Sequence, residues 1–193
     1  RFQQTGLLYR VIPAGGYLPR KDYWSFYDMR QVWNATIYRD YMTRNIVLVY
    51  YLRMAAEYAD SDKDYALSIL RAAEEIDPKN SGLPYEIGKI LLSKGDYQKA
   101  AEEFRKAIKM RVDSAKAHNN LGYALAKMGE REAAMKEYLL AIRYDPDYYL
   151  ARNNLAVLLI NQSRYAEAAE QYRTIIQRNP KHAKAYFDLG RIY

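Results

Sequence analysis

The chain has 193 residues, of which 50% are hydrophobic and 27% charged, a balance that is typical of a folded domain and excludes a disordered chain. It contains no cysteine, which excludes disulfides, thiolate metal ligands and cysteine nucleophiles. The net charge is +7 without a clustered Lys/Arg stripe, so we expect no nucleic-acid binding, whereas an acidic partner or an anionic lipid surface is compatible with it.

The longest apolar run, residues 46–52, is far shorter than the ~20 residues that a membrane-spanning helix needs. We therefore expect no membrane insertion by this segment. The chain starts at Arg1 and shows no signal-peptide pattern, so we interpret it as a piece of a longer protein.

Residues 1–46 form the first predicted region and carry no repeat. Within it, residues 11–16 predict extended or turn structure, and residues 23–37 predict a helix. Aromatic side chains are dense between Tyr23 and Trp33, and such side chains need burial. We expect this segment to pack on the first repeat that follows it.

From residue 47 onward the sequence repeats every 34 residues. Alanine recurs at Ala66, Ala100, Ala134 and Ala168, and a large side chain recurs at Leu70, Phe104, Tyr138 and Tyr172. A third column, Ile87, Leu121, Leu155 and Leu189, is followed each time by a small residue, at Gly88, Gly122, Ala156 and Gly190. Small residues let two antiparallel helices approach closely, so each unit predicts a helical hairpin.

We place the units at residues 47–80, 81–114, 115–148 and 149–182, with a partial fifth unit at 183–193. Small and polar residues predict the turns inside the hairpins at 61–62, 95–96, 129–130 and 163–164. Pro78, Pro146 and Pro180 close three units, whereas Val112 takes the place of proline in the second. In the first unit, Arg53 and Met54 stand where the other units have a leucine or isoleucine followed by a small residue.

These columns resemble the tetratricopeptide repeat, in which a leucine-glycine pair lies in the first helix and alanine, aromatic and alanine positions lie in the second. The resemblance implies an all-α fold, a right-handed superhelix or α-solenoid of helical hairpins. The helix from Ala183 has no hairpin partner in this chain, and its face carries Tyr186, Leu189 and Ile192. We expect either a longer parent protein or self-association through this C-terminal helix.

The N-terminal segment has a second resemblance, carried by Gly6-Leu7-Leu8-Tyr9-Arg10, Pro13, Tyr27-Asp28, Trp33, Tyr38 and Arg44-Asn45. This order is similar to the soluble tail of a bacterial membrane-protein family whose multi-spanning part is similar to protein O-mannosyltransferases. It implies an extracytoplasmic regulatory or substrate-recruiting tail of a membrane glycosyltransferase-like protein, tethered through the missing parent. The extracytoplasmic face of a bacterial membrane is then the favoured location, with the cytoplasm as the alternative.

The sequence offers no set of side chains that predicts catalysis. His118 falls where the repeat places a packing residue, and His182 lies in a loop between repeats. The neighbours Glu102 and Glu103 diverge by about 100° on a helix, so we interpret them as a solvated face rather than an acid/base pair. We expect no cofactor, no metal site and no enzymatic activity.

The inner surface of such a solenoid is formed by the first helix of each hairpin. In the repeat register we expect it to carry Tyr85, Glu86, Lys89, Lys116, Asn119, Asn120, Tyr123, Asn153, Asn154 and Asn161. An asparagine amide both donates and accepts, so a row of them can bind an extended peptide backbone, although the same amides are also compatible with plain solvation.

We therefore predict a scaffold that binds a protein or peptide segment in its concave groove. One version of the family clamps a terminal carboxylate with lysine and asparagine, and here Tyr51 and Ala55 occupy the first two of those positions. We do not expect that clamp.

Overall fold

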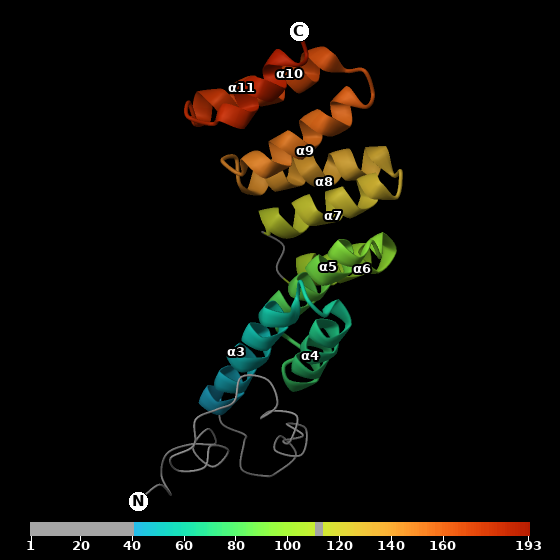
Figure 1. The fold of residues 1–193 in the computed structure, drawn as a ribbon, viewed down its shortest axis with the longest axis vertical. Coiled ribbons are helices and arrows are strands. Elements are labelled where there is room, and N and C mark those ends of the chain that lie inside the picture. Colours follow the sequence, from blue (N-terminus) through green and yellow to red (C-terminus); the bar gives the residue numbers. More distant parts are fainter. Residues whose placement is uncertain (1–40, 111–113) are drawn as a thin grey trace, which may run out of the picture. The chain divides into compact units, whose positions relative to one another are not determined.

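The structure, a computed structural model, describes residues 41–110 and 114–193, with side chains from Leu48 onward. All regular secondary structure in this part of the chain is helical, as the repeat pattern predicts (Figure 1). One compact unit ends at Pro78 and a second begins at Lys79. The predicted turn at 11–16, the predicted helix at 23–37 and their packing on the first repeat lie outside the described residues.

The first compact unit contains the hairpin of α3 (Tyr41–Tyr58) and α4 (Lys63–Ile76). The Asp62 side chain caps α4 by accepting a hydrogen bond of 2.9 Å from the Tyr65 backbone N–H. Helix α3 begins at Tyr41 and so runs across the predicted boundary at 46/47, and this division of the chain stays a prediction.

The assignment of Arg53 and Met54 to the leucine-glycine positions of the first unit is wrong. Arg53 is exposed, whereas Ala55 is 2% exposed. The small residue of this unit is therefore Ala55, and the residue before it is Met54. The same shift moves the two positions compared with the carboxylate clamp to Leu52 and Ala56, which again are neither lysine nor asparagine.

The cause of this shift is a turn that is one residue shorter. The Asp62 N–H bonds to the carbonyl of Tyr58, four residues earlier. In the later hairpins the corresponding bond reaches five residues back, from Asp96 to Leu91, from Glu130 to Leu125 and from Arg164 to Leu159. The second helix of the first hairpin keeps the 34-residue spacing, so the missing residue displaces the positions of the first helix.

The second compact unit contains three hairpins and a further helix. The hairpins are α5 (Gly82–Lys94) with α6 (Tyr97–Met110), α7 (Ala115–Lys127) with α8 (Arg131–Tyr144), and α9 (Tyr149–Ile160) with α10 (Tyr165–Arg178), and α11 (Ala183–Gly190) follows. Figure 1 shows α7, α8 and α9 stacked in chain order, with α10 and α11 overlapping beyond α9. Gly95, Gly129 and Ser163 have positive φ values of 86°, 84° and 59° in the three turns, where the sequence predicts them.

The core of this unit is built from the predicted columns. Ala100, Ala134 and Ala168 are 0% exposed. A Cβ atom at Gly88 would lie 2.7 Å from the Phe104 ring, and one at Gly122 would lie 2.8 Å from the Tyr138 ring. The small residue of each pair therefore makes room for the aromatic ring of its own hairpin.

The interpretation of Glu103 as part of a solvated face is wrong. Its side chain is buried, with the residue 4% exposed, and it lies 3.0 Å from the ammonium of Lys106. Helix α7 packs against α6, so the buried surface of α6 is wider than the stripe of Ala100, Phe104 and Ala107 and reaches Glu103. Between residues 41 and 193, leaving out 111–113, no helix is long and apolar enough to cross a bilayer.

Candidate binding groove

The first helices of the hairpins position the side chains that the sequence places on the inner surface. Helix α7 contacts both α5 and α9, so these helices form one wall of the stack. The predicted residues lie along it, with Tyr85, Glu86 and Lys89 on α5, Lys116, Asn119, Asn120 and Tyr123 on α7, Asn153 and Asn154 on α9, and Asn161 at its C-terminal cap. Lys89, Lys116 and Asn161 are exposed, most of the others are half-buried, and Asn119 is 5% exposed.

Four of these side chains form a hydrogen-bonded series, which we call the amide chain. The Asn154 amide donates to Asn119 Oδ1 at 2.9 Å, and the Asn119 amide donates to Asn120 Oδ1 at 3.2 Å. The Asn120 amide then donates to the Tyr85 hydroxyl at 3.3 Å. The amide chain thus joins α9, α7 and α5, and its polar groups are largely satisfied inside the protein.

At the α5 end of the amide chain, the Tyr85 hydroxyl is partly buried and the nearby Lys89 is paired with a carboxylate. Burial raises the pKa of the Tyr85 hydroxyl, so this group stays protonated at neutral pH. The ammonium of Lys89 lies 5.7 Å from the Tyr85 ring centre and 2.8 Å from the carboxylate of Glu86. Lys89, one of the two lysines predicted for the inner surface, is therefore already paired on its own helix.

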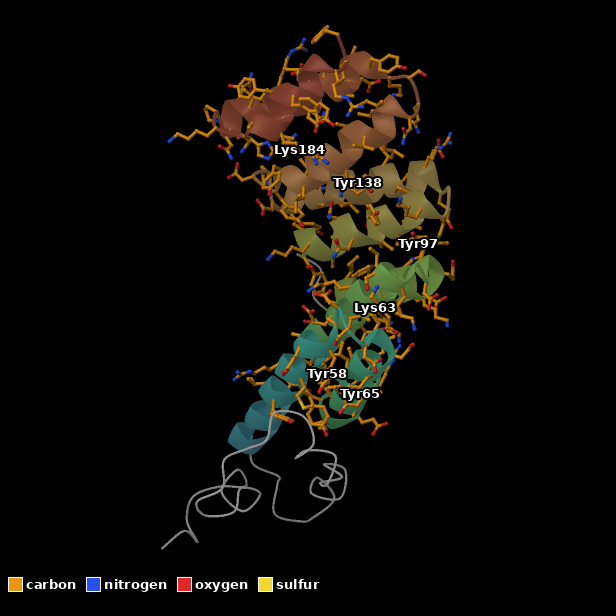
Figure 2. All side chains as sticks on the ribbon, in the orientation of Figure 1. Tyr58, Lys63, Tyr65, Tyr97, Tyr138 and Lys184 are labelled. Carbon is orange, nitrogen blue, oxygen red and sulfur yellow. The ribbon has the colours of Figure 1, made fainter. Side chains whose placement is uncertain are left out.

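Two adjoining pockets lie further along the wall. The pocket between α7 and α9 has a volume of about 530 Å³, and its lining includes Tyr123, Lys127, Arg131, Asn154, Val157 and Asn161. The pocket between α9 and α11 has a volume of about 600 Å³, and its lining includes Asn153, Val157, Asn161, Tyr165, Lys184 and Phe187. Both pockets share Val157 and Asn161, so we describe them together as the groove. Lys184, labelled in Figure 2, belongs to the lining of the second pocket.

The groove contains only part of the predicted set. Tyr123, Asn153, Asn154 and Asn161 line it, whereas Tyr85, Lys89, Lys116, Asn119 and Asn120 do not. Sequence reasoning missed Val157, Lys127, Lys184, Phe187 and Arg191. The 34-residue period could have identified Val157 and Arg191, because they follow Tyr123 at that spacing. They were missed because only asparagine amides and their polar neighbours were considered as binding residues.

The groove is rich in aromatic rings and cations. The Lys127 ammonium lies 5.3 Å from the Tyr123 ring centre, and the Arg191 guanidinium lies 5.9 Å from that of Phe187. Burial raises the pKa of Tyr172, which lies in the floor of the second pocket, to about 12, and the nearby Asp188 carboxylate adds to this effect. Tyr172 is therefore neutral at physiological pH.

The histidines take structural positions outside the groove. His118 is buried between α7 and α8, with its Nδ1 atom 2.7 Å from Glu137 Oε2 and its ring stacked on Tyr144. His182 caps α11 by accepting a hydrogen bond from the Ala185 N–H. Across the described residues, no group of three or more His, Asp or Glu side chains is arranged to hold a metal ion.

The fold and the groove define an α-helical repeat protein with an open lateral wall. A family model described as TPR repeat matches residues 88–129, and one described as tetratricopeptide repeat matches residues 125–181 and 153–193. Together the matched residues make up more than half of the chain. The chain belongs to the tetratricopeptide-repeat family, and its fold is an all-α solenoid.

Solved structures of several repeat proteins are similar to it. The MamA protein is 24% identical with a TM-score of 0.67, covering 76% of this chain and 81% of its own. PilF of Pseudomonas aeruginosa is 22% identical with a TM-score of 0.69, covering 77% and 68%. YrrB, described as a TPR protein with an unusual peptide-binding site, is 24% identical with a TM-score of 0.60, covering 74% of each chain. At these identities the similarity shows the fold, and no curated protein sequence matches the chain significantly.

Proposed function

We propose that this chain is a protein-interaction scaffold that holds an extended segment of another protein in the groove. The observation that carries the proposal is the continuity of the two pockets, which meet at Val157 and Asn161 and extend from α7 to α11. Neighbouring helices lie about 10 Å apart and an extended chain rises ~3.3 Å per residue, so the groove accommodates roughly six residues. The peptide-binding site that is described for YrrB is consistent with this use of the fold.

The groove offers an apolar surface for a peptide side chain and free amides for the peptide backbone. Val157 is 46% exposed although it is apolar, which suits contact with a partner side chain. Within the residues that the structure describes, the side chains of Asn153 and Asn161 make no hydrogen bond to other groups of the chain, so their amides are free to bind a partner backbone. We assign backbone recognition to these two asparagines, and a supporting role to the amides of Asn119, Asn120 and Asn154.

The proposed activity is binding and not catalysis. The alternative context, an extracytoplasmic regulatory or substrate-recruiting tail of a membrane glycosyltransferase-like protein, rests on residues 6–45. Most of these residues lie outside the described part of the chain, so that context and the location that it implies stay predictions.

The test compares two exposed apolar residues, one inside the groove and one outside it. Peptides are first selected from a displayed random library against the wild-type chain, and the selected peptides are then titrated against Val157→Gln and Leu139→Gln. Leu139 on α8 is 51% exposed, similar to Val157, but lines neither pocket. We expect Val157→Gln to weaken binding roughly tenfold, about 1.4 kcal/mol, because a residue at the centre of a binding site contributes most of the affinity.

Leu139→Gln should leave the affinity of the same peptides unchanged. If Leu139→Gln weakens binding and Val157→Gln does not, the binding surface lies on the second helices and the groove proposal is wrong.

A further inference from the structure

Some cations of the second compact unit are held by a carboxylate of the chain, whereas the four cations that line the groove are not. On neighbouring surfaces, Lys89 lies 2.8 Å from Glu86, Arg164 lies 2.6 Å from Glu167, and Arg173 lies 3.2 Å from Glu170. In contrast, none of the four groove cations Lys127, Arg131, Lys184 and Arg191 has a carboxylate within ion-pair distance in the described part of the chain. In the pocket between α7 and α9, the charges of Lys127 and Arg131 are therefore not paired with a carboxylate of the described residues.

Two of these cations are positioned by aromatic rings instead of acids. Lys127 lies over the ring of Tyr123 and Arg191 over the ring of Phe187, each one helical turn away. A ring attracts a cation without neutralising its charge, and it reduces the freedom of a long side chain. The charged groups thus remain available to an incoming anion, with a smaller ordering cost on binding.

The two pockets differ in what they can accept. The pocket between α7 and α9 includes Lys127 and Arg131 and no acidic side chain. The pocket between α9 and α11 includes Asp188 beside its two cations, and the apolar side chains of Phe187, Ile192 and Ile160 line it. The first pocket suits a carboxylate, and the second suits a bulky apolar side chain.

We propose that the occupant of the groove is an extended acidic peptide segment with two anchors. An Asp or Glu side chain lies in the first pocket and is bound by Lys127 and Arg131, and a large apolar side chain lies in the second pocket against Phe187. Because the two pockets are about one helix spacing apart, the anchors are roughly three residues apart in the peptide. This inference rests on the proposed function and specifies the class of partner.

A peptide fits these features better than a membrane or a nucleic acid does. The anion-binding site consists of two cations, Lys127 and Arg131, at one end of the groove. A polyanion such as a nucleic acid requires an extended stripe of Lys and Arg side chains. The path continues into an apolar pocket that a phosphate backbone would leave empty.

The first experiment measures fluorescence anisotropy with labelled nine-residue peptides that contain Glu-x-x-Phe or Phe-x-x-Glu among Ser and Gly. Both orders are used because the pockets do not determine the chain direction. We expect one order to bind, and replacing its Glu with Gln or its Phe with Ser should weaken binding roughly tenfold or more, since each change removes one anchor. Binding of the acidic peptide should also weaken as salt is raised.

The second experiment reverses the charge. The double variant Lys127→Glu with Arg131→Glu should lose the Glu peptide and bind the matching Lys-x-x-Phe or Phe-x-x-Lys peptide instead. The control is Lys136→Glu with Arg143→Glu, two exposed cations on α8 that line neither pocket, which changes the net charge equally. The control should bind the Glu peptide like the wild type, and circular dichroism checks that both variants remain helical.

The outcomes separate this inference from the proposed function. If library-selected peptides depend on Val157 but show no preference for Glu over Gln, the acidic specificity is wrong and the scaffold function stands. If the binding of no selected peptide is weakened by Val157→Gln, the acidic-peptide inference and the proposed groove function are both wrong. If phosphatidylserine vesicles bind through Lys127 and Arg131 while the Glu peptides do not, the occupant is an anionic surface and the inference is overturned.

Discussion

At the scale of single residues, the buried side chain of His118 depends on one specific partner. His118 occupies a packing position between α7 and α8, and its imidazole is satisfied on one side by the Glu137 carboxylate at 2.7 Å. The Nε2 atom on the other side of the ring is buried and has no hydrogen-bond partner among the described residues. The pair therefore depends on a single contact, because a buried donor without an acceptor is costly.

Substitution of Glu137 tests this dependence. Glu137→Ala should lower the free energy of unfolding by about 1–3 kcal/mol, since it leaves the Nδ1–H group of His118 unsatisfied. Glu137→Gln should cost less, because the amide oxygen can still accept the hydrogen bond. Urea denaturation at pH 7 measures both, with Lys136→Ala, an exposed neighbour on α8, expected to stay within about 0.5 kcal/mol of the parent. Equal losses for the Ala and Gln variants would show that the hydrogen bond contributes nothing.

At the scale of the elements, two hairpins are closed by a glycine on the first helix that packs against an aromatic ring on the second. The contacts are closest at Gly88 with Phe104 and at Gly122 with Tyr138. Gly190 occupies the same column, but a Cβ atom there would meet nothing within 4 Å. The same repeat position is therefore tightly packed against a ring at Gly122 and open to solvent at Gly190.

The comparison of these two glycines gives a matched test. Gly122→Ala should destabilise the protein by about 1–3 kcal/mol, because the new methyl group would lie 2.8 Å from the Tyr138 ring and 3.1 Å from the Ala134 carbonyl oxygen. Gly190→Ala should be neutral or slightly stabilising, since alanine is the better helix former and the space is open. Thermal and urea denaturation measure both variants. A Gly122→Ala protein as stable as Gly190→Ala would contradict the packing that we describe for this hairpin.

At the scale of the whole molecule, a repeat protein is held together by contacts between neighbouring units. Most of these contacts in the second compact unit are apolar, but the amide chain adds polar links between successive hairpins. The bonds from Asn120 to Tyr85 and from Asn154 to Asn119 each connect residues 35 positions apart. Because such a solenoid behaves as a nearly one-dimensional array, a lost link should weaken one interface and leave the others intact.

Asn154→Ala removes the link between α9 and α7 and leaves the buried Asn119 oxygen without this donor. We expect a loss of about 1–3 kcal/mol in the stability of the region from α9 to α11, while α7 and α8 keep their protection. Native-state hydrogen exchange resolves the two regions. The control is Asn153→Ala on the same helix, whose side chain makes no hydrogen bond within the described residues. A uniform loss of protection over all helices would contradict the nearest-neighbour coupling.

The sequence by itself determined the hairpins, the turns near Gly95, Gly129 and Ser163, and the aromatic and alanine columns of the core. These features depend on local chemistry, since apolar spacing, small residues and helix-ending residues act within a few positions of one another. The same reasoning placed Tyr123, Asn153, Asn154 and Asn161 on the wall that contains the groove.

Only the tertiary structure decided how those side chains are used. A turn shorter by one residue moved Ala55 into the position assigned to Met54, and the packing of α7 on α6 buried Glu103. Asparagines that are equivalent in the repeat differ in role, since Asn119 is buried and accepts a hydrogen bond from Asn154, whereas Asn153, one repeat later, lines a pocket. The physical reason is that these outcomes depend on distances between atoms of different hairpins, and a repeat pattern specifies which residues are equivalent without specifying which partners each one meets.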